Sequence, residues 1–265
     1  MTYRYVSTRG KTQAGRDNVI VRSLIVIMRS LFAPSMPASR KDRGGVRRAS
    51  LPADRPLPAL QERSKATTER LLAAAEALLR EGGSDAATLR AIADRAGVSL
   101  GIVYRRFPDK DAVLRAVYVR FFERVREANE LALPNAANRS MRRASLRRLA
   151  LSLAAGIADG YRLHRPLLRA LLLYARSHQD RDFRTRAATL NAATFAGLER
   201  LLLSRPEVAA RPRPEIAVRF AIAALASLFQ ERILFEDVVT TPHISQSVLV
   251  TEAARMITAY LGGTA

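Results

Sequence analysis

The most informative stretch of the chain is VSLGIVYRRFPDK, residues 98–110. It places Gly101 inside a helical pattern, follows it with Tyr104 and two arginines, and ends in Phe-Pro-Asp-Lys. A packed core does not need this combination, because glycine inside a helix costs about 1 kcal/mol relative to alanine. The cost makes sense if the missing side chain lets the backbone approach another surface closely. The stretch therefore predicts a short helix that contacts another molecule.

A second short helix, LRAIADRA, precedes this stretch, and a glycine lies between the two. Thr88 is a favourable N-cap for this helix, and Gly97 can take the positive φ of a tight turn. Ser99 is expected to cap the next helix, in which Val103 and Phe107 face inward. Two short helices joined in this way predict a helix-turn-helix. Any helical hairpin has the same outline, so the turn alone leaves DNA binding and a purely structural role open.

The rim and outer side of the later helix include several polar and basic residues. With Val103 and Phe107 inward, seven residues lie there: Ser99, Leu100, Gly101, Ile102, Tyr104, Arg105 and Arg106. Tyr104 and Arg106 can bond phosphate oxygens, and Arg105 can reach a base edge. Lys110 begins the following helix, whose free N–H groups also favour a phosphate. The sequence thus predicts a recognition helix with phosphate contacts around it.

Residues 67–117 resemble the N-terminal DNA-binding domain of the TetR family of bacterial transcriptional regulators. The resemblance rests on the patterns L-x-x-I-A-x-x-A-G-V-S and G-x-x-Y-x-x-F-x-x-K. It implies an all-α fold and a homodimer whose recognition helices enter the major groove at each half of a palindromic operator. It also implies a variable helical domain that binds a small-molecule effector. By position, the implied DNA-binding residues are Thr88, Arg90, Ser99, Leu100, Gly101, Ile102, Tyr104, Arg105, Arg106 and Lys110.

Two of these positions depart from the family pattern. Members usually have a polar or basic residue where this chain has Leu100, and often a small or polar one where it has Ile102. An apolar side chain at such a position has one suitable partner on a base edge, the C5-methyl group of thymine. The alternative is that Leu100 packs under the preceding helix and reads no base.

The charge of the chain also indicates a polyanionic partner. Lys and Arg number 44 against 24 Asp and Glu, a net charge of +20. Residues 1–60 carry 12 basic and 3 acidic residues, whereas residues 61–110 carry 9 and 7. A strongly basic protein favours nucleic acid, although a generally arginine-rich surface is the plain alternative. Because the motif itself is nearly balanced, it must bind through individually placed cations.

Composition divides the chain into three parts. Residues 1–60 are rich in proline and show no helical period, which predicts a disordered basic N-terminal extension. Residues 61–115 form the expected helix-turn-helix domain, and residues 116–265 the ligand-binding and dimerisation domain. The apolar segment at residues 20–33 is broken by two arginines and is too short to span a bilayer, which needs about 20 residues. We therefore expect a cytoplasmic protein with no membrane contact. A start codon assigned too far upstream is another explanation for this apolar segment.

The C-terminal part reads as generic helices, punctuated by prolines. Asp180 and Asp182 are read as the solvated start of one of them. The resemblance implies that the last two helices form half of an intersubunit four-helix bundle, and the alternative is an ordinary core without a dimer. The expected helices lie near 139–160, 165–177, 180–204, 214–236 and 245–261.

Other chemistry finds little support in the sequence. The absence of cysteine excludes disulfides and thiolate sites, and no two of His164, His178 and His243 have helical metal-ligand spacing. We expect no cofactor, no metal and no enzymatic activity. The function expected is a ligand-responsive repressor that a small molecule releases from DNA. The alternatives are an activator or a regulator that senses a protein, and a helical enzyme with a vestigial helix-turn-helix.

Overall fold

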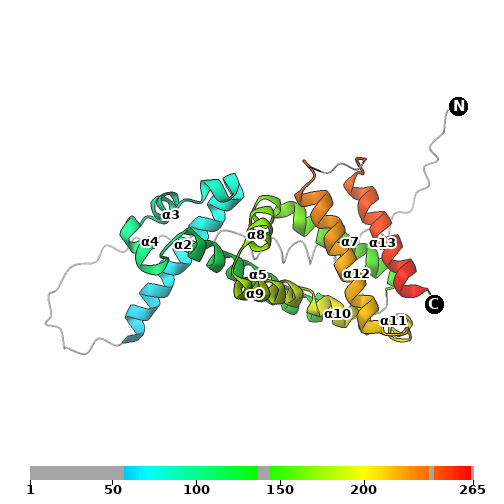
Figure 1. The fold of residues 1–265 in the computed structure, drawn as a ribbon. Coiled ribbons are helices and arrows are strands. Elements are labelled where there is room, and N and C mark those ends of the chain that lie inside the picture. The colour runs from blue at the N-terminus through cyan, green and yellow to red at the C-terminus, as the bar shows by residue number, and fades with distance from the viewer. Residues whose placement is uncertain (1–56, 137–143, 239–241, 264–265) are drawn as a thin grey trace, which may run out of the picture. The chain divides into compact units, whose positions relative to one another are not determined.

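The structure, a computed structural model of the chain, describes residues 57–136, 144–238 and 242–263. Every regular element within these ranges is a helix, which confirms the predicted all-α fold (Figure 1). The apolar segment at 20–33 and the predicted N-terminal extension up to residue 56 lie outside the described residues. No described helix has the length and apolar character needed to cross a bilayer.

The N-terminal helices follow the expected order. The first helix is kinked at Gly82 and Gly83, and Gly83 has φ 65° and ψ −157°. Both glycines leave the helical conformation, so the regular part of this helix stops before them. The four elements are α2 (Leu57–Ala86), α3 (Leu89–Ala96), α4 (Leu100–Arg106) and α5 (Lys110–Ala136).

A small apolar core holds these helices together. Burying each large aliphatic side chain stabilises the fold by about 1.5–3 kcal/mol. Several of these side chains are completely inaccessible to solvent: Leu71, Leu79, Ile92, Val103, Val113 and Val117. The buried carboxylate of Glu76 faces Arg80 (3.1 Å) and Arg120 (3.5 Å), because a charge in a core needs a partner of opposite sign. Arg120 thus joins α5 to α2 by charge.

The remaining helices match most of the expected ranges. They are α7 (Leu146–Leu163), α8 (Arg165–Ser177), α9 (Arg181–Thr194), α10 (Ala196–Leu203), α11 (Pro206–Ala209), α12 (Pro214–Phe229), the π-helix η1 (Gln230–Leu234) and α13 (Gln246–Gly262). Helix α7 begins at Leu146, where the hydroxyl of Ser145 accepts a hydrogen bond from Arg148 N at 3.3 Å. The expected start near 139 lies in the undescribed segment 137–143.

The single helix expected over 180–204 is wrong, because the chain forms two helices there. The break lies at Phe195, between α9 and α10. The Thr194 carbonyl accepts a hydrogen bond from Asn129 Nδ2 at 2.7 Å, and the Thr194 hydroxyl bonds back to Asn191 O at 2.7 Å. At the break Phe195 N donates to Ala192 O at 3.1 Å, three residues back instead of the four of a regular α-helix.

The chain divides into two compact units. Among described residues, one unit comprises 57–121 with 166–187, and the other comprises 122–136, 144–165, 188–238 and 242–263. In the second unit α7 packs against α13, and α12 contacts both (Figure 1). The functional division at residue 115 stays a prediction.

Candidate nucleic-acid interface

The turn between α3 and α4 has the geometry that its sequence predicts. Thr88 Oγ1 accepts a hydrogen bond from Ala91 N at 3.1 Å and so caps α3. Gly97 takes φ 64°, and Val98 N donates to Ala93 O at 3.1 Å. This is a Schellman arrangement, in which a left-handed residue ends the helix and turns the chain. Any side chain at Gly97 would strain that turn.

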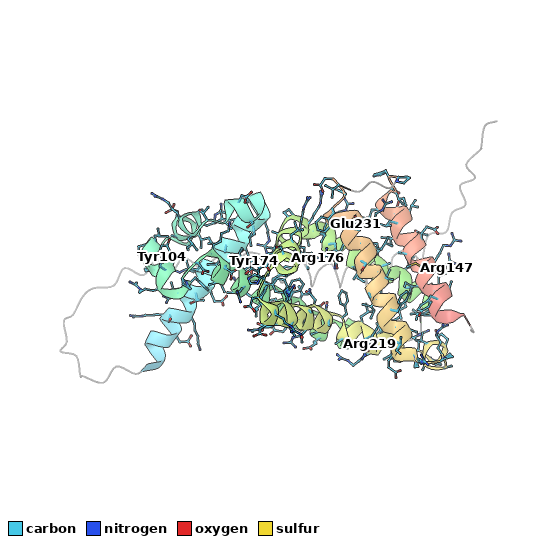
Figure 2. The ribbon with its side chains drawn as sticks, viewed as in Figure 1. Tyr104, Arg147, Tyr174, Arg176, Arg219 and Glu231 are labelled. Atoms are coloured by element: carbon cyan, nitrogen blue, oxygen red, sulfur yellow. The ribbon has the colours of Figure 1, made fainter. Side chains whose placement is uncertain are left out.

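Helix α4 has one buried side and one exposed side, as predicted. Val103 is fully buried and Phe107 is 8% exposed, whereas Tyr104 is 52% exposed (Figure 2). Ser99 occupies the N-cap position with extended backbone, but its side chain makes no capping bond. The expectation that the Ser99 side chain caps the helix is therefore wrong. Its hydroxyl is not used to close the helix start.

The apolar pair and the glycine of α4 lie on its rim. Leu100 and Ile102 are each partly exposed, so Leu100 is not completely buried in the way Val103 is. A Cβ atom added at Gly101 would meet no atom within 4 Å. The protein's own packing thus does not require glycine there. The open surface above Gly101 is available to a partner.

Two of the predicted basic contacts, Arg90 and Arg105, point into solvent. Both are exposed, and neither forms a hydrogen bond or ion pair with another residue that the structure describes. Thr88 is exposed beside them, although its hydroxyl caps α3. Together with Tyr104 these residues form an exposed polar and basic surface on α3 and α4.

The other two predicted cations are held by the protein. Arg106 donates from Nε to Thr68 Oγ1 (3.1 Å) and from Nη2 to the hydroxyl (3.1 Å) and carbonyl (3.2 Å) of Ser64. Lys110 Nζ donates to Ser84 O at 2.5 Å. Both side chains therefore tie α4 and α5 to α2. If either side chain contacts a phosphate, it does so in addition to this structural role.

Sequence reasoning missed a polar cluster at the start of α5. Asp180 was expected as solvated charge, but its Oδ2 pairs with Arg115 Nη1 at 2.5 Å and its Oδ1 accepts from Asp182 N at 2.8 Å. His178 lies 2.9 Å from Asp111 Oδ1. The hydrogen bond from Arg115 lowers the pKa of Asp180. The spacing of Asp111 and Arg115, four positions apart on one helix, was a local signal, but Asp111 and His178 are 67 positions apart and no local pattern joins them.

Comparisons with known proteins single out the same region. Residues 71–117 match the sequence model of the bacterial regulatory proteins, tetR family. The HTH-type transcriptional repressor KstR of Rhodococcus jostii is 43% identical over 61 residues, which are 23% of this chain and 29% of KstR. The chain thus spans less than a third of the length of the curated relatives it matches.

Solved structures extend the likeness to the fold of most of the chain. The fatty acid degradation regulator FadR from Bacillus halodurans has a TM-score of 0.52 at 15% identity, covering 74% of this chain and 95% of FadR. FadR from Bacillus subtilis, solved with stearoyl-CoA, has a TM-score of 0.51 at 15% identity, covering 74% and 99%. The matched residues are those that build the helix-turn-helix, so this part of the chain is similar to the bacterial regulatory proteins of the tetR family, and the solved structures extend the similarity in fold alone.

Proposed function

We propose that the chain is a DNA-binding transcriptional regulator that places α4 in the major groove, and that it represses until a small molecule releases it. The observation that carries the proposal is the exposed face of α3 and α4. Tyr104, Arg105 and Arg90 are exposed there, and the surface above Gly101 is open. A short helix with these features fits the width of the major groove.

The contacts divide into those that read bases and those that position the helix. Arg90 and Arg105 are the candidates for bidentate contacts to guanine, each worth about 1–3 kcal/mol of discrimination. Tyr104, Arg106 and Lys110 are the candidates for phosphate contacts, which set register without reading sequence. The remaining proposed contacts, on the rim of the same surface, are Thr88, Ser99, Leu100, Gly101 and Ile102.

We also propose a homodimer formed through α12 and α13. Apolar side chains on these adjacent helices stay exposed, with Ile216 at 60%, Phe220 at 61% and Met256 at 45%. The rings of Phe220 and Tyr260 lie 5.4 Å apart, so the exposed groups form one patch across both helices. Such patches mark association surfaces. A pair of helix-turn-helix domains matches a palindromic operator, whereas one domain contacts too few bases.

The proposals of repressor activity and of a small-molecule effector rest on similar proteins. KstR is named a transcriptional repressor, and FadR of Bacillus subtilis was solved with stearoyl-CoA. The name of KstR supports repression, and the FadR complex supports control by a small molecule. We place this regulation in the cytoplasm as part of the proposal. Fatty acyl-CoA thioesters are therefore the first effector class to test by release of bound DNA.

A selection experiment tests the core of this proposal. The full chain is incubated with a library of random duplexes, and the bound fraction is sequenced after several rounds. We expect an enriched palindrome, bound by a dimer in light scattering, whose selectivity is relaxed by Arg105→Ala. Enrichment of no sequence, or binding of one asymmetric site by a monomer, would overturn the proposal.

A further inference from the structure

The first turn of α5 contains a carboxylate bound by three other side chains. Both oxygens of Asp111 are used, since Tyr174 Oη donates to Oδ1 at 2.6 Å and Arg115 Nε donates to Oδ2 at 2.6 Å. His178 Nε2 lies 2.9 Å from Oδ1. Tyr174 belongs to α8 (Figure 2), and His178 follows the end of that helix. Asp111 therefore joins α5 to α8 and to the connection between α8 and α9.

The polar side chains of the cluster are hydrogen-bonded to one another. Asp180 N donates to His178 Nδ1 at 3.0 Å, so Nδ1 acts as an acceptor and Nε2 is the ring nitrogen that can donate to Asp111. Arg115 bridges Asp111 and Asp180, with 2.6 Å and 2.5 Å separations. The guanidinium of Arg115 lies 5.3 Å from the centre of the Phe183 ring, which packs against His178. The cluster thus fixes geometry rather than merely balancing charge.

The cluster lies next to the elements that carry the proposed interface. Helix α4 ends at Arg106, and α5 begins at Lys110, directly before Asp111. Asp109 Oδ1 accepts from Ala112 N at 2.7 Å and caps α5. The free N–H groups of that first turn are suited to a phosphate. Anything that fixes the first turn of α5 also fixes Lys110 and those N–H groups.

We propose that the Asp111 cluster, which comprises Asp111, Arg115, Tyr174, His178 and Asp180, is a positioning device for DNA binding. It holds the first turn of α5 where a phosphate of the operator can meet it. Asp111 itself touches no DNA and acts through the place it gives to Lys110. This inference rests on the proposed function and deepens it, because it assigns part of the affinity to residues outside the helix-turn-helix.

If charge alone governed DNA affinity, replacing Asp111 would have the opposite effect. The test therefore rests on the sign of the change in affinity. Asp111 puts a negative charge near the phosphate, so its removal would strengthen binding if bulk electrostatics governed affinity. Displacement of the first turn would weaken binding despite the gain in net positive charge. Tyr174→Phe is the neutral companion, because it removes only the hydroxyl that bonds Asp111 and leaves the ring beside Phe183.

The experiment measures affinity for the duplex that the wild-type full chain selects. For Tyr174→Phe and for Asp111→Asn we expect affinity to fall about fivefold to tenfold. Each change removes a hydrogen bond to a charged group, and only part of the free energy lost with that bond should reach the phosphate contact. The slope of log K against log salt should decrease by about 0.9 for each phosphate that the variant no longer neutralises. Tyr174→Phe should also add little to Lys110→Ala, because the effects of two changes that act on the same phosphate are not additive.

Two variants serve as matched controls. Asp94→Asn removes an exposed charge from α3, so it should leave affinity unchanged or raise it. Tyr161→Phe removes a buried hydroxyl that accepts from Gln230 Nε2 at 3.1 Å in the other compact unit, and should leave affinity and slope unchanged. Thermal unfolding confirms that each variant is folded. If Asp111→Asn does not fold, the affinity and salt slope of Tyr174→Phe alone test the inference.

Two outcomes would overturn the inference. One is wild-type or tighter binding by both cluster variants with an unchanged salt slope. Another is full additivity of Tyr174→Phe with Lys110→Ala, which would indicate a general structural effect. If the wild-type chain selects no duplex at all, the proposed function itself fails, and this result is distinct from either outcome.

Discussion

Among single residues, Gly101 is a glycine that the packing of the protein itself does not require. The position has no neighbour within 4 Å of an added Cβ and does not have a positive φ, unlike Gly97 at 64°. Two glycines four residues apart therefore have different physical reasons. Gly97 supplies a backbone conformation that side chains rarely adopt, whereas Gly101 leaves the outer surface of the helix bare.

Replacing each glycine by alanine separates the two reasons. Gly101→Ala should raise the free energy of unfolding by about 0.5–1 kcal/mol, since alanine favours the helix and meets no obstacle. The same change should weaken operator binding, because the added methyl lies where DNA approaches. Gly97→Ala should instead lower stability by about 1 kcal/mol. Urea unfolding and operator titration measure both, and unchanged DNA affinity in Gly101→Ala would contradict close approach.

The apolar pair Leu100 and Ile102 predicts a preference for thymine. Burying one methyl group is worth about 0.8 kcal/mol, which corresponds to about a fourfold preference per contact. Replacing operator thymines singly by deoxyuridine removes only that methyl, so one or more substitutions in each half-site should weaken binding. If none does so while Arg105→Ala still relaxes specificity, Leu100 packs under α3 and reads no base.

At the scale of the element, helix ends follow local signals and helix breaks follow tertiary bonds. The ends of α3 are set by the Thr88 side chain and the Gly97 conformation, both visible in the sequence. The break at Phe195 accompanies a bond from Asn129 to the Thr194 carbonyl, and these two residues are 65 positions apart. Local patterning predicts the first kind of boundary and has no access to the second.

The link between α5, α8 and α9 should make stability depend on pH. Burial tends to raise the pKa of Asp111, but hydrogen bonds from Tyr174 and Arg115 outweigh it and lower the pKa. The pKa of Asp180 is lowered by the hydrogen bond from Arg115. A carboxyl whose folded-state pKa lies below its unfolded value of about 3.9 contributes stability above that value. The contribution is lost as the pH falls through the folded pKa.

Urea unfolding between pH 7 and pH 2 tests this link. The wild-type midpoint should be steady down to about pH 5 and then fall as these carboxylates take up protons. Asp111→Asn should start lower and fall less steeply, because it has no Asp111 charge to lose. Parallel profiles for the two proteins would show that the Asp111 carboxylate has the same pKa folded and unfolded.

At the scale of the whole molecule, the exposed patch on α12 and α13 bears on assembly. Ile216 and Phe220 are one turn apart on α12, and Met256 and Tyr260 are one turn apart on α13. Their spacing puts each pair on one helix face, and each residue is at least 37% exposed. The structure thus shows which side of α12 remains uncovered.

A single charge in this patch should separate the subunits. Phe220→Glu puts a carboxylate where the proposed dimer would bury it, and an unpaired buried charge costs about 3–5 kcal/mol. Light scattering should show a shift from dimer to monomer, and operator affinity should fall by about tenfold or more, since each 1.4 kcal/mol is a factor of ten. Leu173→Glu is the control, because Leu173 is 45% exposed on α8, in the other compact unit. A Phe220→Glu protein that stays dimeric would place the interface elsewhere.

Local signals in the chain are enough for part of the architecture and leave the rest to packing. The all-α class, the helix-turn-helix with its turn and the inward side of α4 follow from periodicity, Thr88 and Gly97, because these signals act within a few residues. The bond between Arg106 and Ser64 spans 42 positions, and the one between Asp111 and His178 spans 67. Such pairs became visible in the folded protein alone, since they depend on how helices pack. A solvated charge and a structural one look alike in a sequence until packing brings a partner within reach.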